Sequence, residues 1–451
     1  MEILVDIFCW LIYHYLDSNI KEVSMKKLLV IFIAILAAST ISVSAQASKF
    51  SGTEIRILAG SIPWTDYIKS RIPEFTQKTG IKVVLEIYPE EILRNKITVE
   101  LTARNRDLDV YTMSPPQETM LFVKNGWLTP IDDFVKASPE YDIADYIPSA
   151  LAGGEVGGKL YAIPLFTERP VLYYRTDIFA KAGIKPPKTF DELMADAKLL
   201  NNPSAKIYGF VERGAGNPAV TQFVTFLRGF GGDYQSADYR TATINTPEAI
   251  KAYQYYGEIL RNYGPPGVLN MNWGETSNLF AQGLVAMRID NDSQFAQVVD
   301  KNKSLVWDKV GFATVPAGPA GMGSCNVAPW ALCIPSYSAK KAAAWEFIRW
   351  ATSKEISLGA MQAGQFGARQ SVWKNPEATK GLPADLVAAV QGNLGTKYSN
   401  ERPVMVQVGK ARDIIGTVIQ AAITGKTDAE LKVIADKANA EFQQLLDQDY
   451  K

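Results

Sequence analysis

Short apolar runs alternate with helix-like stretches over the first part of this chain, and no other feature restricts its fold as much. EIRILAG (54–60), IKVVLEIY (81–88) and DLDVYTMS (107–114) read as strands. TDYIKSRIPEFTQKTG and PEEILRNKITVELTAR, which separate them, carry the apolar spacing of amphipathic helices. This alternation predicts an α/β fold with a parallel sheet covered by helices. Ligands of such sheets bind beyond the carboxyl ends of the strands. The loops at those ends are 60–66, 88–91 and 112–117.

The chain is also too long for a single core. A mature chain of about 400 residues is expected to form two lobes. Candidate crossings between them are Thr167–Pro170, Val327–Ala331 and Tyr398–Pro403, so both lobes would be discontinuous in sequence. We expect the N-terminal lobe to hold 48–167 and 332–398, and the C-terminal lobe to hold 168–331 and 399–451.

Residues 25–45 have the three parts of a secretory signal peptide. A basic start precedes the apolar stretch Leu28–Ala38, and small residues predict cleavage after Ala45 or Ala47. The apolar stretch is shorter than the roughly 20 residues that span a bilayer. Residues 1–24 read as a leader extension, either from a start codon placed too early or as a genuine long leader. We therefore expect a periplasmic protein.

Histidine is the rarest residue type of the chain. His14 is the one histidine, and it lies in the leader extension. The exported protein would therefore lack the commonest general base and metal ligand. Basic and acidic residues number 47 each, a balance that argues against nucleic acid as a partner. With no phosphate-binding or dinucleotide motif and no histidine in the exported protein, we expect no cofactor and no metal site. We also expect a monomer.

Two cysteines remain after export, Cys325 and Cys333 in SCNVAPWALC. An oxidising compartment would permit a small disulfide loop between them. The other reading makes Cys333 a small buried residue of the strand-like run ALCIP. The sequence leaves both open.

Three tryptophans lie in loops among Gly, Pro and Asn: Trp64, Trp273 and Trp330. The apolar face of a sugar ring stacks on such indoles, although packing within the loop is the other reading for each. Planar or charged side chains would pair with vicinal hydroxyls, and solvated or capping roles are their alternatives. The candidates are Asp66, Glu90, Gln117, Glu168, Arg169, Arg213, Asn217, Asp290, Asp292 and Arg369.

Segments spread over about 390 residues resemble the family 1 extracellular solute-binding proteins of ABC importers, the maltose-binding-like group. They are NGWLTPIDD (125–133), GKLYAIP (158–164), YYRTDIFAKAGIKPPKTFDEL (173–193), FLRGFGGDY (226–234), GLVAMRID (283–290), IPSYSAKKAAAWEFIRWATSKE (334–355) and GARQSV (367–372). The stretch at 213–214 and the ARQSV segment are most similar to the branch that binds sugars and sugar alcohols. The resemblance implies the type II periplasmic-binding-protein fold, with a three-segment hinge and a ligand cleft between two lobes.

The resemblance also implies a contact set and a function. The set contains Trp64, Asp66, Glu90, Ser114, Gln117, Glu168, Arg213, Trp273, Asp290, Asp292, Trp330 and Arg369. The implied function is capture of a sugar or sugar alcohol by hinge closure, and its delivery to ABC permease subunits in the inner membrane. Two alternatives remain. One is a non-sugar solute such as a phosphoester, polyamine or oligopeptide. The other is an exported carbohydrate-active enzyme with a carboxylate pair. Since these contact groups do not ordinarily titrate near neutral pH, binding is expected to vary little between about pH 6 and 8.

Overall fold

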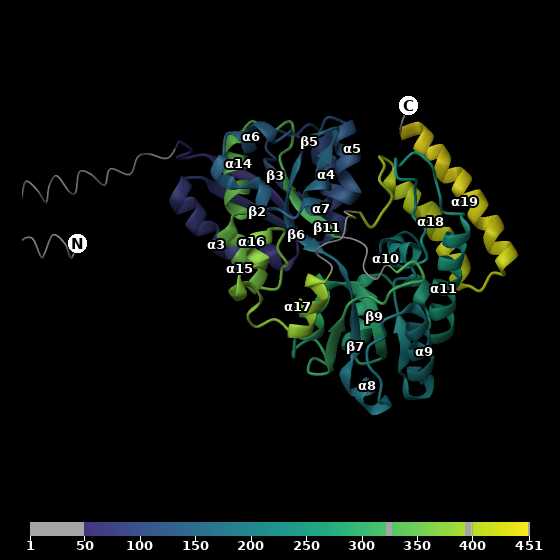
Figure 1. Ribbon diagram of the computed structural model, residues 1–451. Coiled ribbons are helices and arrows are strands. Elements are labelled where there is room, and N and C mark those ends of the chain that lie inside the picture. Colours follow the sequence, from purple (N-terminus) through teal and green to yellow (C-terminus); the bar gives the residue numbers. More distant parts are fainter. Residues whose placement is uncertain (1–48, 322–326, 393–397, 399, 450–451) are drawn as a thin grey trace, which may run out of the picture.

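The computed structural model describes residues 49–321, 327–392, 398 and 400–449. These residues form two lobes, each built around its own β-sheet (Figure 1). The predicted leader extension and signal peptide, and Cys325, lie outside the described residues.

The sheet of the first lobe has the strand order β2-β1-β3-β11-β6. Its strands are β1 (Glu54–Gly60), β2 (Lys82–Tyr88), β3 (Val110–Met113), β6 (Ala162–Glu168) and β11 (Ala328–Cys333). β1 pairs in parallel with β2 and β3, whereas β11 is antiparallel to β3 and β6. The first two predicted strands match, but the third is shorter than 107–114. The Asp109 carboxylate, rather than a strand carbonyl, accepts the Arg56 N–H at 3.0 Å, so the regular ladder begins at Val110.

Helices surround this sheet, and a small hairpin of β4 (Glu155–Val156) and β5 (Lys159–Leu160) lies beside it. The helices of this part of the chain are α3 (Pro63–Thr79), α4 (Glu90–Thr102), α5 (Pro115–Lys124), α6 (Asp132–Lys136), α7 (Pro148–Ala152), α14 (Lys341–Ala351), α15 (Lys354–Gln362) and α16 (Gln370–Trp373). The predicted stop of α3 at Gly80 is confirmed. Gly80 takes the left-handed conformation with φ of 74°, and its N–H donates to the Thr76 carbonyl at 2.8 Å.

The second lobe has a sheet in the order β10-β7-β9-β8. Its strands are β7 (Pro170–Arg175), β8 (Tyr208–Val211), β9 (Val285–Asn291) and β10 (Val310–Ala313). Around it lie α8 (Thr176–Ala182), α9 (Phe190–Leu200), α10 (Gly216–Gly229), α11 (Pro247–Tyr263), α12 (Trp273–Ala281) and α13 (Phe295–Val298). The two C-terminal helices, α18 (Val408–Ile423) and α19 (Asp428–Asp449), pack on this lobe through α10 and α11.

One helix lies with a different lobe from the one expected. α17 (Ala384–Gln391) belongs to the segment 332–398 that we assigned to the N-terminal lobe, but it packs against β10 and β7. Its apolar side covers the edge of the second sheet, and Asp385 accepts the Phe312 N–H at 2.8 Å. The apolar residues of α17 thus find their burial on the second lobe.

The three crossings between the lobes lie next to one another. β6 ends at Glu168 and β7 begins at Pro170, so Arg169 forms the first crossing. Ala328 pairs with Glu168, which places the second crossing beside the first. The Val327 N–H donates to the Tyr398 carbonyl at 2.9 Å and joins the third. Because β11 pairs entirely within the first sheet, Ala328–Ala331 of the predicted crossing belong to the first lobe.

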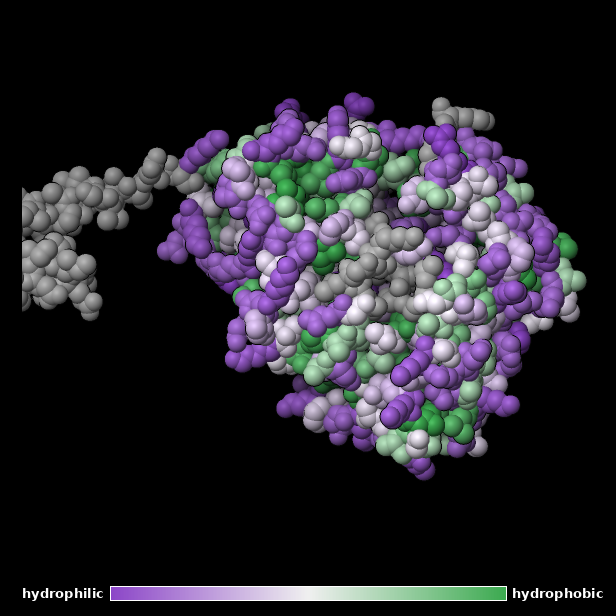
Figure 2. Space-filling view, in the orientation of Figure 1, coloured by the Kyte–Doolittle hydropathy of each residue, from purple (hydrophilic) through white to green (hydrophobic). Residues whose placement is uncertain are grey.

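Hydrophilic residues dominate the rim of the face in Figure 2, with hydrophobic residues in smaller groups between them. No helix within the described ranges combines the length and apolarity needed to cross a membrane.

Candidate functional site

Glu168 lies where the two lobes meet and is surrounded by hydrogen-bond donors. Its carboxylate accepts the Asn291 side-chain amide at 3.0 Å, the Ser293 hydroxyl, and the Trp330 indole N–H at 3.3 Å. Burial raises the pKa of Glu168 to about 7, and the nearby charge of Asp292 acts in the same direction. The end of β6 therefore carries an acceptor that donors from both lobes hold in place.

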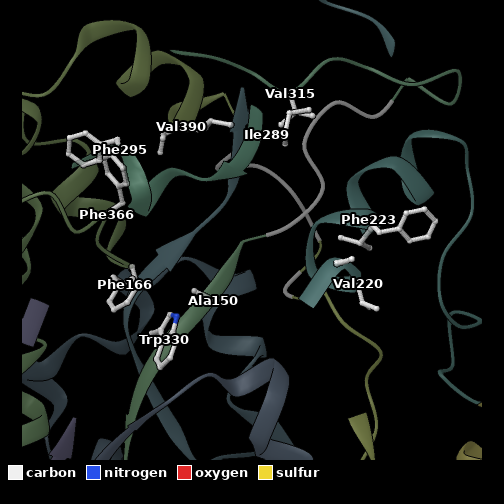
Figure 3. Close-up of a cluster of buried hydrophobic side chains, with 14 of the residues drawn as sticks. Ala150, Phe166, Val220, Phe223, Ile289, Phe295, Val315, Trp330, Phe366 and Val390 are labelled. Atoms are coloured by element: carbon white, nitrogen blue, oxygen red, sulfur yellow. The ribbon is translucent and has the colours of Figure 1, made fainter. Parts of the chain in front are cut away.

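Trp330 forms one wall at this point. Its ring lies nearly parallel to that of Phe166 on the neighbouring strand, with centroids 6.3 Å apart and an interplanar angle of 16° (Figure 3). The Arg94 guanidinium carbon lies 5.7 Å from the centre of the indole. Trp330 is only 9% exposed, and its N–H is held by Glu168.

Asp290 and Arg213 form a buried ion pair on the second lobe. The Arg213 side chain donates from Nε and Nη2 to the Asp290 carboxylate, which also accepts Arg288 at 2.8 Å and Gln222 at 2.9 Å. Burial raises the pKa of Asp290, but the two guanidiniums outweigh that effect and hold it below its ordinary value. With its oxygens occupied in this way, Asp290 orients Arg213.

Asp292 holds the first crossing. Its carboxylate accepts Nη1 of Arg169 at 2.9 Å and the Arg169 backbone N–H at 3.2 Å, and both side chains are fully buried. Burial raises the pKa of Asp292 to about 6, against the opposing charge of Arg169. Asp292 thus fixes the backbone from which Glu168 projects.

Glu90, Arg94 and Glu118 of the first lobe form an acid–arginine cluster beside Trp330. Arg94 on α4 donates to Glu90 at 2.7 Å, one turn earlier, and forms an ion pair with Glu118 on α5. Burial raises the pKa of Glu90, but the charges of Arg94 and Arg402 lower it by more, so the net shift is downward. The Glu90 carboxylate is therefore an ionised acceptor beside Arg94.

Two further arginines connect this cluster with the C-terminal part of the chain. Arg402, in the third crossing, donates to the Ser114 hydroxyl at 3.1 Å. Arg412, on α18, donates to the Gln117 side-chain oxygen at 2.9 Å. Both bonds join the first lobe to segments that come from beyond it.

The sequence did not predict Arg94, Arg402 or Arg412 as site residues. Arg402 lay inside a predicted crossing and Arg94 lies one helical turn after the candidate Glu90, so both carried a usable signal. Arg412 lies in an ordinary amphipathic pattern, and nothing local marks it.

A cavity of about 370 Å³ opens beside these groups. Arg94, Gln117, Glu118 and Trp330 line it, together with other residues of α4 and α5, the end of β3 and the segment 406–410. This volume is within the range of small-molecule sites. The described residues contain no cluster of three or more His, Cys, Asp or Glu side chains arranged for a metal ion.

Trp273 is the exposed tryptophan at the start of α12, with 43% of its surface open. The Asn272 side chain caps this helix, and Glu275 completes the capping box. The backbone N–H groups of Gly214 and Ala215 donate to the Met271 carbonyl, each at 3.1 Å. These bonds hold Trp273 next to the loop that follows Arg213, with its indole free to stack.

Within the described ranges, three predicted contact residues show no hydrogen bond to the groups named above. Trp64 is buried in the core of the first lobe, and Asp66 is exposed in the first turn of α3. Arg369 is 1% exposed and lies over the rings of Tyr141 and Tyr146. Its guanidinium donates to the Thr352 carbonyl at 2.8 Å and to two other backbone carbonyls, so it serves the packing of the first lobe.

Cys333 is a free, buried thiol in β11, and its sulfur lies 3.5 Å from the Tyr111 carbonyl. Its proposed disulfide partner, Cys325, lies outside the described residues. Burial is thus the observed role of Cys333, as in the second reading of the sequence.

Comparison with known proteins gives one family. The sequence signature described as "Bacterial extracellular solute-binding protein" matches residues 61–357. A mannitol-binding protein of Pseudomonas aeruginosa is 33% identical over 276 residues, which cover 60% of this chain and 62% of that protein.

Two solved solute-binding proteins of ABC transporters are similar in structure; each is 28% identical and covers 88% of this chain. The one from Agrobacterium radiobacter, in complex with ribitol, is covered over 99% of its length at a TM-score of 0.78. The one from Agrobacterium vitis, with bound D-mannitol, is covered over 98% at 0.71. The likeness to these two solved structures confirms the expected type II fold.

Proposed function

This chain belongs to the bacterial extracellular solute-binding protein family, and from that membership we propose that it captures a sugar or sugar alcohol between its lobes and delivers it to an ABC permease. Members of the family bind solutes for transporters and catalyse no reaction, so the carbohydrate-active enzyme is set aside. The named ligands of the similar proteins, mannitol and ribitol, support a polyol.

One observation carries the proposal. The Glu168 carboxylate and its three donors lie at the crossings, beside side chains of both lobes. A vicinal pair of hydroxyls both donates and accepts hydrogen bonds, so it matches a site that offers acceptors and donors within a few ångströms. Since both lobes contribute, the set is complete only when they are close together.

We assign the contacts by position. The proposed contact residues are Glu90, Ser114, Gln117, Glu168, Arg213, Trp273 and Trp330. Asp290 and Asp292 act through Arg213 and Arg169, which they position. Trp64, Asp66 and Arg369 are left out because of where they lie.

The test is calorimetry of the purified protein with a panel of sugars and alditols, together with a phosphoester, a polyamine and an oligopeptide. We expect one polyhydroxylated compound to bind at micromolar affinity or better, about −8 kcal/mol or more favourable. Binding only to one of the other solutes would contradict the proposal.

Trp273→Ala tests the stacking contact. Loss of an aromatic contact of this kind costs about 2 kcal/mol or more, which weakens binding roughly 30-fold. The matched control is Trp307→Ala, which removes another exposed tryptophan, 48% open, outside the proposed set. Equal affinities for both variants would contradict the assignment of Trp273.

The family's extracellular location supports export to the periplasm. We propose that the mature protein begins after Ala45 or Ala47 and is a monomer with no nucleic-acid partner. N-terminal sequencing of protein from the periplasmic fraction tests the cleavage site. Light scattering of the same sample tests the oligomeric state.

A further inference from the structure

Arg412 spans the two lobes. It projects from α18, which packs on α10 and α11 of the second lobe. Its Nη2 donates to the Thr221 hydroxyl on α10 at 3.1 Å, and its Nη1 donates to the Gln117 oxygen on α5 of the first lobe at 2.9 Å. A single guanidinium therefore contacts a neutral oxygen on each side of the cleft.

Arg412 differs in its partners from the other arginines here. Arg94, Arg213 and Arg402 each have a carboxylate in contact: Glu90, Asp290 and Glu401 respectively. For Arg412 the described residues provide no ion pair. Its Nε is buried without a hydrogen-bond partner among those residues.

The surroundings make this cation costly. Burial, together with the positive charges of Arg402 and Arg94, holds the pKa of Arg412 well below its ordinary value, although the nearby charge of Glu401 opposes them. An arginine nevertheless stays charged in a protein. A buried cation whose hydrogen-bond partners are all neutral is stabilised when an anion enters beside it.

We propose that Arg412 contacts the solute and gives the site a preference for a sugar acid, with a carboxylate at one end, over the alditol of the same carbon skeleton. The inference rests on the proposed capture of a polyhydroxylated solute between the lobes, and it adds the acids of the same sugars to the ligand classes considered there. The hydroxyls of such a solute meet Glu168 and its donors, and the carboxylate accepts from the free Nε of Arg412. Charge-assisted hydrogen bonds are the stronger ones, so the charged end sets the preference.

The experiment compares aldonates with alditols by calorimetry on the full-length mature protein. The probes are D-gluconate with D-glucitol, D-mannonate with D-mannitol, and D-ribonate with ribitol. For the skeleton that fits, we expect the aldonate to bind about tenfold tighter or more. An alditol that binds as tightly as its aldonate overturns the inference but leaves the proposed function standing. Failure of every sugar, alditol and aldonate overturns the proposed function itself.

Two variants separate charge from folding. Arg412→Gln removes the cation, and we expect it to abolish the aldonate preference, because the aldonate should lose about tenfold more affinity than the alditol. Gln117→Glu keeps Arg412 and gives it a permanent carboxylate partner that stands in for the carboxylate of the solute. It should therefore also abolish the preference, and it tests the inference even if Arg412→Gln does not fold. Arg349→Gln, an ion-paired arginine of α14, is the control and should retain the preference. Retention of the preference in Gln117→Glu overturns the inference.

Discussion

Glu168 shows what a single residue gains from its surroundings. The sequence placed it at a crossing and predicted no titration near neutral pH. In the structure, burial and the nearby Asp292 raise its pKa to about 7, and Asp292 itself has a pKa of about 6. These two carboxyls are therefore strongly perturbed exceptions, because Glu168 is enclosed by Asn291 and Trp330, and Asp292 by Arg169, all far from them in the sequence.

The raised pKa makes stability depend on pH. An exposed glutamate has a pKa of 4.5, so between about pH 4.5 and 7 the folded protein holds a proton that the unfolded chain has lost. The free energy of unfolding falls as pH rises through this window, by at most about 3 kcal/mol from this group. Glu168→Gln never ionises. The variant does not lose stability through this window as the parent does. The difference in unfolding free energy, variant minus parent, should therefore be larger at pH 8 than at pH 5. Urea denaturation at both pH values measures this, and an equal difference at both would contradict it.

Arg369 was predicted to contact ligand, but the structure gives it a packing role. Arg369→Gln takes the charged donor away from the carbonyls of Tyr141, Asp142 and Thr352 and from the Asp145 carboxylate, and we expect a loss of roughly 3 kcal/mol in unfolding free energy. The affinity for the solute should not change. Arg349→Gln, whose partly exposed guanidinium pairs with Glu346, should cost about 1 kcal/mol or less in the same denaturation assay. A large loss of affinity in folded Arg369→Gln would return it to the contact set.

Residues next to a strand end or a crossing were predictable, because the sequence pattern marks those places. Glu168, Ser114, Gln117 and Trp330 are of this kind. Trp64 has the same kind of sequence position but points into the core. The pattern locates a loop, and only packing decides which way its side chains face.

At the scale of elements, α10 and α18 approach closely at two glycines. A Cβ added to Gly416 on α18 would lie 2.5 Å from the backbone of Gly216 on α10. Gly416→Ala would push the helices apart, and we expect a loss of about 1–3 kcal/mol in unfolding free energy. Because α18 carries Arg412, the solute affinity should also fall.

Gly409→Ala, in the same helix, is the matched control. An added Cβ there meets nothing within 4 Å, and alanine favours a helix over glycine by roughly 0.5–1 kcal/mol. Chemical denaturation should show unchanged or slightly higher stability. Similar effects of the two substitutions would mean that the contact with Gly216 is not what fixes α18.

Local periodicity predicted elements well. The strand 54–60 and the helix FDELMADAKLL match β1 and α9. The insertion of β11 between β3 and β6, and the docking of α17 on β10, were beyond it, because both join segments far apart in the chain. Such pairings depend on which strand edge or sheet surface the rest of the chain leaves exposed. A short window of sequence does not contain that information.

At the scale of the molecule, the contacts across the lobes predict closure on binding. Phe295 of the second lobe lies 5.7 Å from Phe366, whose carbonyl accepts the Thr167 N–H (Figure 3). Added solute completes further contacts between the lobes, so we expect small-angle scattering to show a decrease in radius of gyration at saturation. Solute at 100 times its dissociation constant should add about 2.7 kcal/mol to stability. Unchanged scattering with proven binding would mean that the lobes are already closed.

The central position of β11 also governs when the first lobe can form. β3 and β6 reach each other only through this strand, which is synthesised more than 150 residues after them. Pairings so distant in sequence form slowly. A nascent chain that has not reached Ala328 thus lacks a complete first sheet, however long its earlier segments have been available. Completion of the first sheet therefore belongs to a late stage of synthesis.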